Sequence, residues 1–188
     1  MTRKDCSIKV ATKSLTRLPP HTICGARKVS DIDIVQDYGF QLTPKVINKL
    51  KSHLCKENTW IVFAVGFHYQ LNFKRVKERY LDKFWAIKSE SGCSWPQLVW
   101  MGLHTLDGFL RQTTLPHNQK IRKYNGDIAE YWATKNVTVV DTASMSDGIN
   151  SYDGRHYGVG FNMLKVNLLL GILKRYYDEN ENELSLEN

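Results

Sequence analysis

The stretch "WIVFAVG", residues Trp60 to Gly66, decides the fold class. It is a continuous apolar run rich in β-branched and aromatic residues, with "KENT" before it and a glycine at its end. A strand buried on both faces has this composition, because the side chains on each face meet apolar partners. The stretch therefore predicts an interior strand of a parallel sheet.

Two more buried strands are predicted further along the chain. "PQLVWMGLH" supplies Leu98 to Met101, and "NVTVVD" supplies Val137 to Val140. Between the first two strands, residues 72–88 carry apolar side chains at three- and four-residue steps, and residues 118–134 repeat this spacing before the third. Such spacing is typical of amphipathic helices. The segment 105–118 between them is predicted to be a loop.

Two further helices complete the pattern. Residues 43–54 begin with Thr43 and Pro44, an N-cap residue followed by a proline at the first helical position. Residues 160–177 form an apolar segment after the third strand. Strands that alternate with helices predict a parallel sheet with helices on both faces, here a three-layer α/β/α sandwich.

The predicted organisation is a single domain over residues 31–177. It opens with a short alternating strand, "DIDIV", at residues 31–35. Residues 1–30, which include Pro19-Pro20, are predicted to be an irregular N-terminal segment. Residues 178–188 carry acids and no base, and are predicted to be a flexible acidic tail.

Polar side chains follow each of the three buried strands. Gly66-Phe67-His68 comes after the first, Gly102-Leu103-His104 after the second, and the loop 142–156 after the third. Ligands of parallel sheets bind beyond the carboxyl ends of the strands, so these segments are the candidate site. The third loop contains "SYDGRHYG", in which Asp153 stands three residues before His156.

This Asp-x-x-His spacing has two interpretations. A histidine can take a proton from a hydroxyl group, and a carboxylate close to its ring can fix the tautomer and stabilise the imidazolium. Alternatively, Asp153 caps the following helix and His156 is an ordinary surface residue. The spacing by itself leaves both interpretations open.

The segment "VVDTASMSDGINSYDGRHYGVGFNMLKVNLLLGIL" resembles the closing segment of SGNH-type (GDSL-like) hydrolases, where an Asp-x-x-His block precedes the final helix. "WIVFAVGFHYQLNF" is similar to the family block in which a buried strand ends in Gly-x-Asn. His68 replaces that asparagine, as in branches related to the PC-esterase and glycan O-acyl-esterase groups. The resemblance extends over roughly Asp31 to Lys174.

The resemblance implies a three-layer sandwich that hydrolyses or transfers an ester-linked acyl group through a serine acyl-enzyme. His156 would be the general base and then the general acid, and Asp153 would orient its ring. Gly66 and His68 would lie at the oxyanion hole. The implied substrate is a small-molecule or glycan ester, and neither a cofactor nor a metal ion is expected.

The nucleophile of the family is missing from this sequence. It belongs to a Gly-Asp-Ser block after the first strand, and no Gly-Asp-Ser occurs in the 188 residues. The upstream serines Ser7, Ser14, Ser30 and Ser52 do not belong to such a block. The family's second block is a glycine that adds an amide to the oxyanion hole, and here it is either Gly25 or Gly39, between which the sequence does not decide. Either the chain lacks the first strand, or it is a complete relative that no longer catalyses. In both cases we expect a poor esterase.

Two other functions remain open. The first is a non-catalytic relative that binds a glycan or a protein partner through the same cleft. The second is an unrelated flavodoxin-like domain that binds an anion at its strand ends. Against the second, no P-loop is present, and no Gly-x-Gly-x-x-Gly follows a strand.

The net charge of +7 gives no evidence of a nucleic-acid partner, because the basic residues form no stripe interleaved with aromatics. No apolar run is long enough to span a membrane, and no apolar segment of a signal peptide follows "MTRKDC". The cellular location and the oligomeric state are therefore left unassigned.

The cysteines and one sequon add little. Cys6, Cys24, Cys55 and Cys93 form no Cys-x-x-Cys, so two disulfides and four reduced thiols are both compatible with their spacing. Asn136-Val137-Thr138 is a glycosylation sequon, which matters only in a secreted chain.

Overall fold

The computed structural model describes residues 10–11, 32–33, 41–106, 114–154 and 156–186. The chain divides into two compact units: Tyr38–Leu168 forms one, and Met1–Asp37 together with Leu169–Asn188 forms the other. The predicted domain limits at residues 31 and 177 stay predictions.

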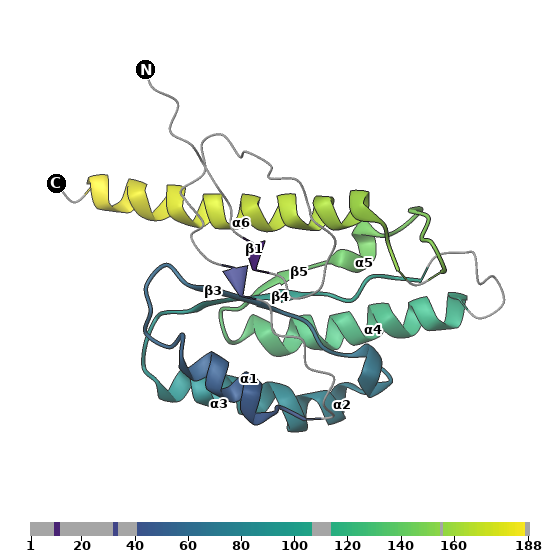
Figure 1. Ribbon diagram of the computed structural model, residues 1–188, viewed down its shortest axis with the longest axis horizontal. Coiled ribbons are helices and arrows are strands. Elements are labelled where there is room, and N and C mark those ends of the chain that lie inside the picture. Colours follow the sequence, from purple (N-terminus) through teal and green to yellow (C-terminus); the bar gives the residue numbers. More distant parts are fainter. Residues whose placement is uncertain (1–9, 12–31, 34–40, 107–113, 155, 187–188) are drawn as a thin grey trace, which may run out of the picture. The chain divides into compact units, whose positions relative to one another are not determined.

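The unit Tyr38–Leu168 is built on a parallel sheet of three strands (Figure 1). They are β3 (Trp60–Phe63), β4 (Gln97–Met101) and β5 (Thr138–Val140), in that order across the sheet. Ile61 is paired with Leu98, and Val99 with Thr138. All three predicted strands are confirmed, but the predicted burial of β3 on both faces is wrong: β3 lies at an edge of this sheet, none of its four residues is buried, and Val62 is 40 % exposed. β3 also ends at Phe63, so that residues 64–66 leave the sheet.

Helices cover this sheet on both sides (Figure 1). One side carries α1 (Pro44–Lys51), α2 (Phe73–Val76), the π-helical turn η2 (Lys77–Leu81), α3 (Asp82–Glu90) and α4 (Thr114–Ala133). The order β3-β4-β5 does not reverse, so successive right-handed crossovers place their helices on the same face. The first turns of α6 (Val159–Leu186) lie on the other side. The predicted α/β sandwich with a parallel sheet is confirmed.

Most helix boundaries follow the sequence signals. Pro44 opens α1 as predicted. Asn72 caps α2, where its Oδ1 accepts a hydrogen bond from the backbone N–H of Arg75 at 3.0 Å. The helix over 72–88 is confirmed, with the π-helical turn between α2 and α3.

Two helix boundaries were predicted wrongly. α4 begins at Thr114, inside the segment predicted to be a loop, because a proline in the first turn, here Pro116, does not interrupt a helix. α6 continues past Tyr177 to Leu186, since "ENENELSL" contains good helix formers and neither glycine nor proline.

An aromatic core fixes the sheet against α3 and α4. Trp100 and Trp132 are fully buried. The ring of Phe63 stacks on Phe84 at 4.6 Å and meets the edges of Trp100 and Trp132 at 5.2 and 5.6 Å. Such edge contacts add to the large apolar area that these rings bury. The strands that carry the site therefore rest on a rigid layer.

A disulfide joins Cys55, which follows α1, to Cys93, which precedes β4. The ammonium group of Lys88 donates hydrogen bonds to the backbone carbonyls of Cys93 and Ser94 beside it. Burial lowers the pKa of Lys88. For this cysteine pair the structure selects the disulfide, whereas Cys6 and Cys24 lie outside the described residues.

In the other unit, β1 (Val10–Ala11) pairs in parallel with β2 (Ile32–Asp33). The short strand predicted within residues 31–35 is thereby confirmed, while β1 lies in the segment predicted to be irregular. In the described part of the chain, no helix has the length and apolar character needed to cross a membrane.

Candidate functional site

The segment after β4 is held in place by two asparagines of α4. Asn125 Oδ1 accepts from the backbone N–H of Leu103 at 3.0 Å, and its Nδ2 donates to the carbonyl of Leu103 at 2.7 Å. About two helical turns earlier, on the same face of α4, Asn118 makes the same two bonds to Leu106, at 2.7 and 2.8 Å. Each amide side chain thus satisfies a backbone N–H and C=O that no strand pairs.

Two more elements are tied to the same segment at Thr105. Its backbone N–H donates at 2.9 Å to the Oγ of Ser146, the C-cap residue of the short helix α5 (Thr142–Met145) that follows β5. Its carbonyl accepts from the hydroxyl of Tyr157, just before α6, at 2.8 Å. These bonds bring the end of β4, the loop after β5 and the start of α6 to one edge of the sheet, as predicted for parallel strands.

His104 lies among aromatic rings at this edge. Its ring is 5.6 Å from that of Phe67, 5.0 Å from that of Tyr157 and 6.3 Å from that of Phe161, between centroids. Lys165, from the first turns of α6, places its Nζ 3.5 Å from His104 Nδ1. Burial lowers the pKa of Lys165.

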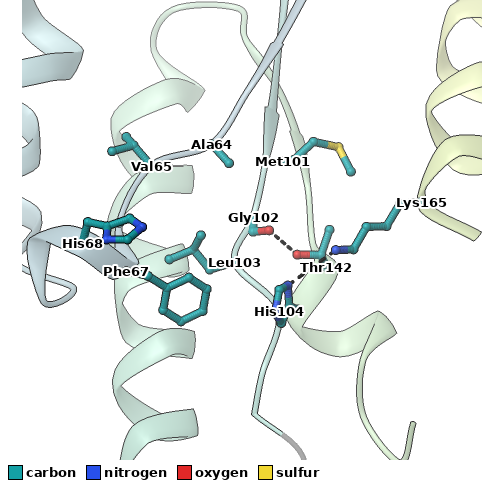
Figure 2. A pocket seen from close by; sticks show the side chains of 11 residues that line it. Ala64, Val65, Phe67, His68, Met101, Gly102, Leu103, His104, Thr142 and Lys165 are labelled. Atoms are coloured by element: carbon teal, nitrogen blue, oxygen red, sulfur yellow. Dashed lines mark hydrogen bonds between the residues drawn. The ribbon is translucent and has the colours of Figure 1, made fainter. Parts of the chain in front are cut away.

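A pocket of about 340 Å³ opens beside these residues (Figure 2). It is lined by residues 64–68, residues 101–104, Thr142 and Lys165. The hydroxyl of Thr142 donates to the carbonyl of Gly102 across its floor (Figure 2). The predicted oxyanion residues Gly66 and His68 are both part of the lining.

Close packing explains the glycine at position 66. A Cβ atom there would lie 2.6 Å from Leu103 Cδ1 and 2.8 Å from Tyr124 Cε1, closer than real contacts allow. The Tyr124 hydroxyl donates to the carbonyl of Val65 at 2.7 Å, which holds the ring against the strand end. Burial, with a smaller contribution from Tyr69, raises the pKa of Tyr124 and keeps it a neutral donor. The oxyanion role of Gly66 stays a prediction.

Asp153 and His156 contact each other twice. Asp153 Oδ2 lies 2.6 Å from His156 Nδ1, and Asp153 Oδ1 accepts from the backbone N–H of His156 at 2.7 Å. Gly154, with φ +83°, makes the turn between them. α6 begins only at Val159, so Asp153 is not its N-cap. The His156 side chain is 80 % exposed.

The structure groups the predicted site residues into two pairs. Gly66 and His68 line the pocket, whereas Asp153 and His156 are not among its lining residues. Tyr157 connects the two regions, because it follows His156 in the chain and packs its ring on His104. The Asp153–His156 pair therefore lies before α6 and outside the lining of the pocket.

The loop predicted after β5 begins instead with the short helix α5, capped by Asp141, and two of its serines make local hydrogen bonds. Ser144 Oγ donates to Asp141 Oδ2 at 2.5 Å, and Ser146 Oγ donates to the carbonyl of Ala143 at 2.8 Å. Ser7, Ser14, Ser30, Gly25 and Gly39 lie outside the described residues. Within the ranges that the structure describes, no group of three or more His, Cys, Asp or Glu side chains could hold a metal ion.

Sequence reasoning missed Lys165 and the two asparagines. Asn118 and Asn125 stand seven residues apart on one helix, a spacing that places both on the same face and could have marked them. Lys165 gave no comparable signal, because a single lysine in the mostly apolar stretch 163–173 forms no motif with its neighbours in the sequence.

The fold and the site define an α/β protein with a candidate site at the carboxyl ends of its parallel strands. No family model and no curated protein sequence matches the chain. Among solved structures, it is similar to a mutant of Axe2, an acetyl-xylooligosaccharide esterase from Geobacillus, with a TM-score of 0.41 and 14% identity over 68% of this chain and 67% of that one. This likeness is too distant to bear on the chemistry of the site.

Proposed function

We propose that this chain is an SGNH-like ester-hydrolase domain that has kept its acid–base pair and lacks the Gly-Asp-Ser block in its sequence. The observation that supports the proposal best is the double contact of Asp153 with the backbone N–H and the ring Nδ1 of His156. A carboxylate in this position fixes the ring tautomer and stabilises an imidazolium. The resemblance of the two sequence blocks gives this geometry its hydrolytic interpretation.

Each proposed residue has a distinct role. His156 would accept a proton at Nε2 from an attacking hydroxyl group and return it to the leaving alcohol. Asp153 would hold the ring throughout. The backbone N–H of Gly66 and the ring of His68 would donate to the carbonyl oxygen as negative charge develops on it. The proposed substrate is an acyl ester of a small molecule or of a glycan.

Without the serine block, this chain should turn over esters poorly. Losing one member of a catalytic triad removes most of the rate, and only the part due to binding and the oxyanion hole is kept. We therefore expect acetate release at the level of the buffer.

Acetate release from glucose pentaacetate tests this expectation. An alkyl ester is chosen because exposed histidines do not cleave it appreciably. The unaltered protein, His156→Ala and the matched control His117→Ala, which changes another exposed histidine, should all give the buffer rate. A rate that His156→Ala abolishes and His117→Ala leaves unchanged would contradict the proposal and reveal a nucleophile in this chain.

A second candidate function is ligand binding without catalysis. It is favoured by one observation, namely that Asp153 and His156 do not line the pocket. Binding of glucose pentaacetate, compared with glucose in the same titration, tests it. Equal affinity for the two sugars would count against any site that recognises esters.

A further inference from the structure

The pocket has a cationic end and an apolar wall. Lys165 and His104 meet at one end, where Nζ lies 3.5 Å from Nδ1 (Figure 2). Phe67, Met101 and Leu103 contribute apolar side chains to the rest of the lining. None of the described residues that line the pocket is acidic. Among the described lining residues, no carboxylate is therefore available to pair with Lys165 at the cationic end.

The contact between the two side chains fixes their hydrogen-bonding roles. A lysine ammonium group only donates, so Nδ1 of His104 accepts and the ring proton of the neutral form is on Nε2. Lys165 has three N–H donors, of which this contact uses one. The end of the pocket thus presents donors from two side chains, one from the segment after β4 and one from α6.

The ammonium group of Lys165 loses hydration in this position. Burial lowers its pKa, which means that the environment disfavours the charged form. The ring of Phe161, whose centroid is 4.5 Å from Nζ, compensates in part through a cation–π contact. A bound anion would compensate far more, since an opposite charge at hydrogen-bond distance stabilises the charged form.

We propose that this pocket binds a monocarboxylate that carries an aliphatic or aromatic tail. The carboxylate oxygens accept from Lys165 and His104, and the tail packs on Phe67, Met101 and Leu103. A volume of about 340 Å³ is at the lower end of the range for small-molecule sites. Inorganic phosphate fits less well, because it needs many donors and gains nothing from the apolar wall.

A titration with octanoate tests the proposal on the unaltered protein. We expect the methyl signal of Met101 to move in a methyl NMR spectrum, while that of Met163, which does not line the pocket, stays in place. Octanol, which has the same tail without the charge, should bind at least about tenfold more weakly, as expected for a lost charge-assisted hydrogen bond. Phosphate should leave the Met101 signal unmoved.

Variants of the two donor side chains test whether the carboxylate of octanoate binds at Lys165 and His104. Lys165→Met should weaken octanoate binding about tenfold or more, and His104→Gln should also weaken it. The matched control Lys174→Met changes an exposed lysine of the same helix that pairs with Asp178, and it should leave the affinity unchanged.

Any of four results would overturn the proposal: a Met101 signal that octanoate does not move, equal affinity for octanoate and octanol, a Met101 signal that phosphate also moves, or unchanged affinity in Lys165→Met. The comparison of octanoate with octanol needs no variant, so it decides even if a substitution prevents folding. The proposal does not rest on ester hydrolysis. The two tests are independent: failure to bind octanoate would not change the interpretation of the acetate-release experiment, and acetate release would not change the interpretation of octanoate binding.

Discussion

At the scale of single residues, Gly154 is the position on which the Asp153–His156 contact depends most. Its φ of +83° lies in the left-handed region, which side chains with a Cβ rarely adopt. This conformation turns the chain so that the carboxylate of Asp153 reaches both the backbone and the ring of His156. The geometry of the turn therefore explains why a glycine stands between Asp153 and His156.

Replacing Gly154 with alanine should lower the free energy of unfolding by roughly 1–2 kcal/mol, because the left-handed conformation is strained for alanine. Urea unfolding measures the change. The matched control is Gly126→Ala, in the middle of α4, where a Cβ meets nothing within 4 Å. That control should raise the stability by roughly 0.5–1 kcal/mol. Equal effects at the two positions would show that the turn does not need its glycine.

At the scale of elements, the sequence predicts strands better than their connections. "WIVFAVG" is predictable as a strand because β-branched and aromatic residues favour strands, and β3 begins at Trp60 as expected. Its apolar run does not reveal that Val62 is exposed and that β3 lies at an edge of the three-stranded sheet. The start of α4 was missed because Pro116 resembles a loop signal, although Thr113, a residue type that caps helices, directly precedes Thr114 in the sequence. The conformation of residues 103–106 could not be predicted either. Their backbone bonds to side chains of α4 and not to a neighbouring strand, and no strand pattern marks such bonds in the sequence.

The two asparagines of α4 should be costly to remove. In Asn125→Ala, the N–H and the carbonyl of Leu103, a buried residue, lose their partners. Unsatisfied buried backbone groups cost roughly 1–3 kcal/mol each, so the free energy of unfolding should fall by about 2 kcal/mol or more. Chemical denaturation of the variant gives this value.

An exposed asparagine of α1 provides the control. Asn48→Ala should change the stability by less than about 0.5 kcal/mol, as is usual for surface positions. If Asn125→Ala were as mild as this control, the account of how α4 fixes the wall of the pocket would be wrong.

At the scale of the whole molecule, the candidate site was predictable only in part. Gly66 and His68 were found because they follow a predicted strand. Asp153 and His156 were found because their spacing matches the Asp-x-x-His block. The pocket itself depends on Lys165, which reaches it from α6, more than sixty residues after His104. Such long-range proximity is a product of packing, and a single sequence holds no local pattern for it.

The disulfide closes a large part of the molecule. Cys55 and Cys93 are 38 residues apart, and β3, α2 and α3 lie between them. In the chain-entropy model, a disulfide that closes a loop of this length raises the free energy of unfolding by about 4 kcal/mol, because it restricts the unfolded chain. Dithiothreitol should therefore lower the thermal midpoint of the unaltered protein and leave that of the Cys55→Ser, Cys93→Ser double variant unchanged. A midpoint that does not respond to reduction would show that this bond does not stabilise the fold.

The central claim is that Asp153 holds the imidazole of His156 in one orientation, with the ring proton on the nitrogen that faces the carboxylate. A nitrogen-15 NMR spectrum of the ring, assigned with His156→Gln and recorded where the ring is neutral, measures this directly. We predict that the unaltered protein has its proton on Nδ1, and that Asp153→Ala loses this preference. A ring that carries its proton mainly on Nε2 in the unaltered protein would contradict the account.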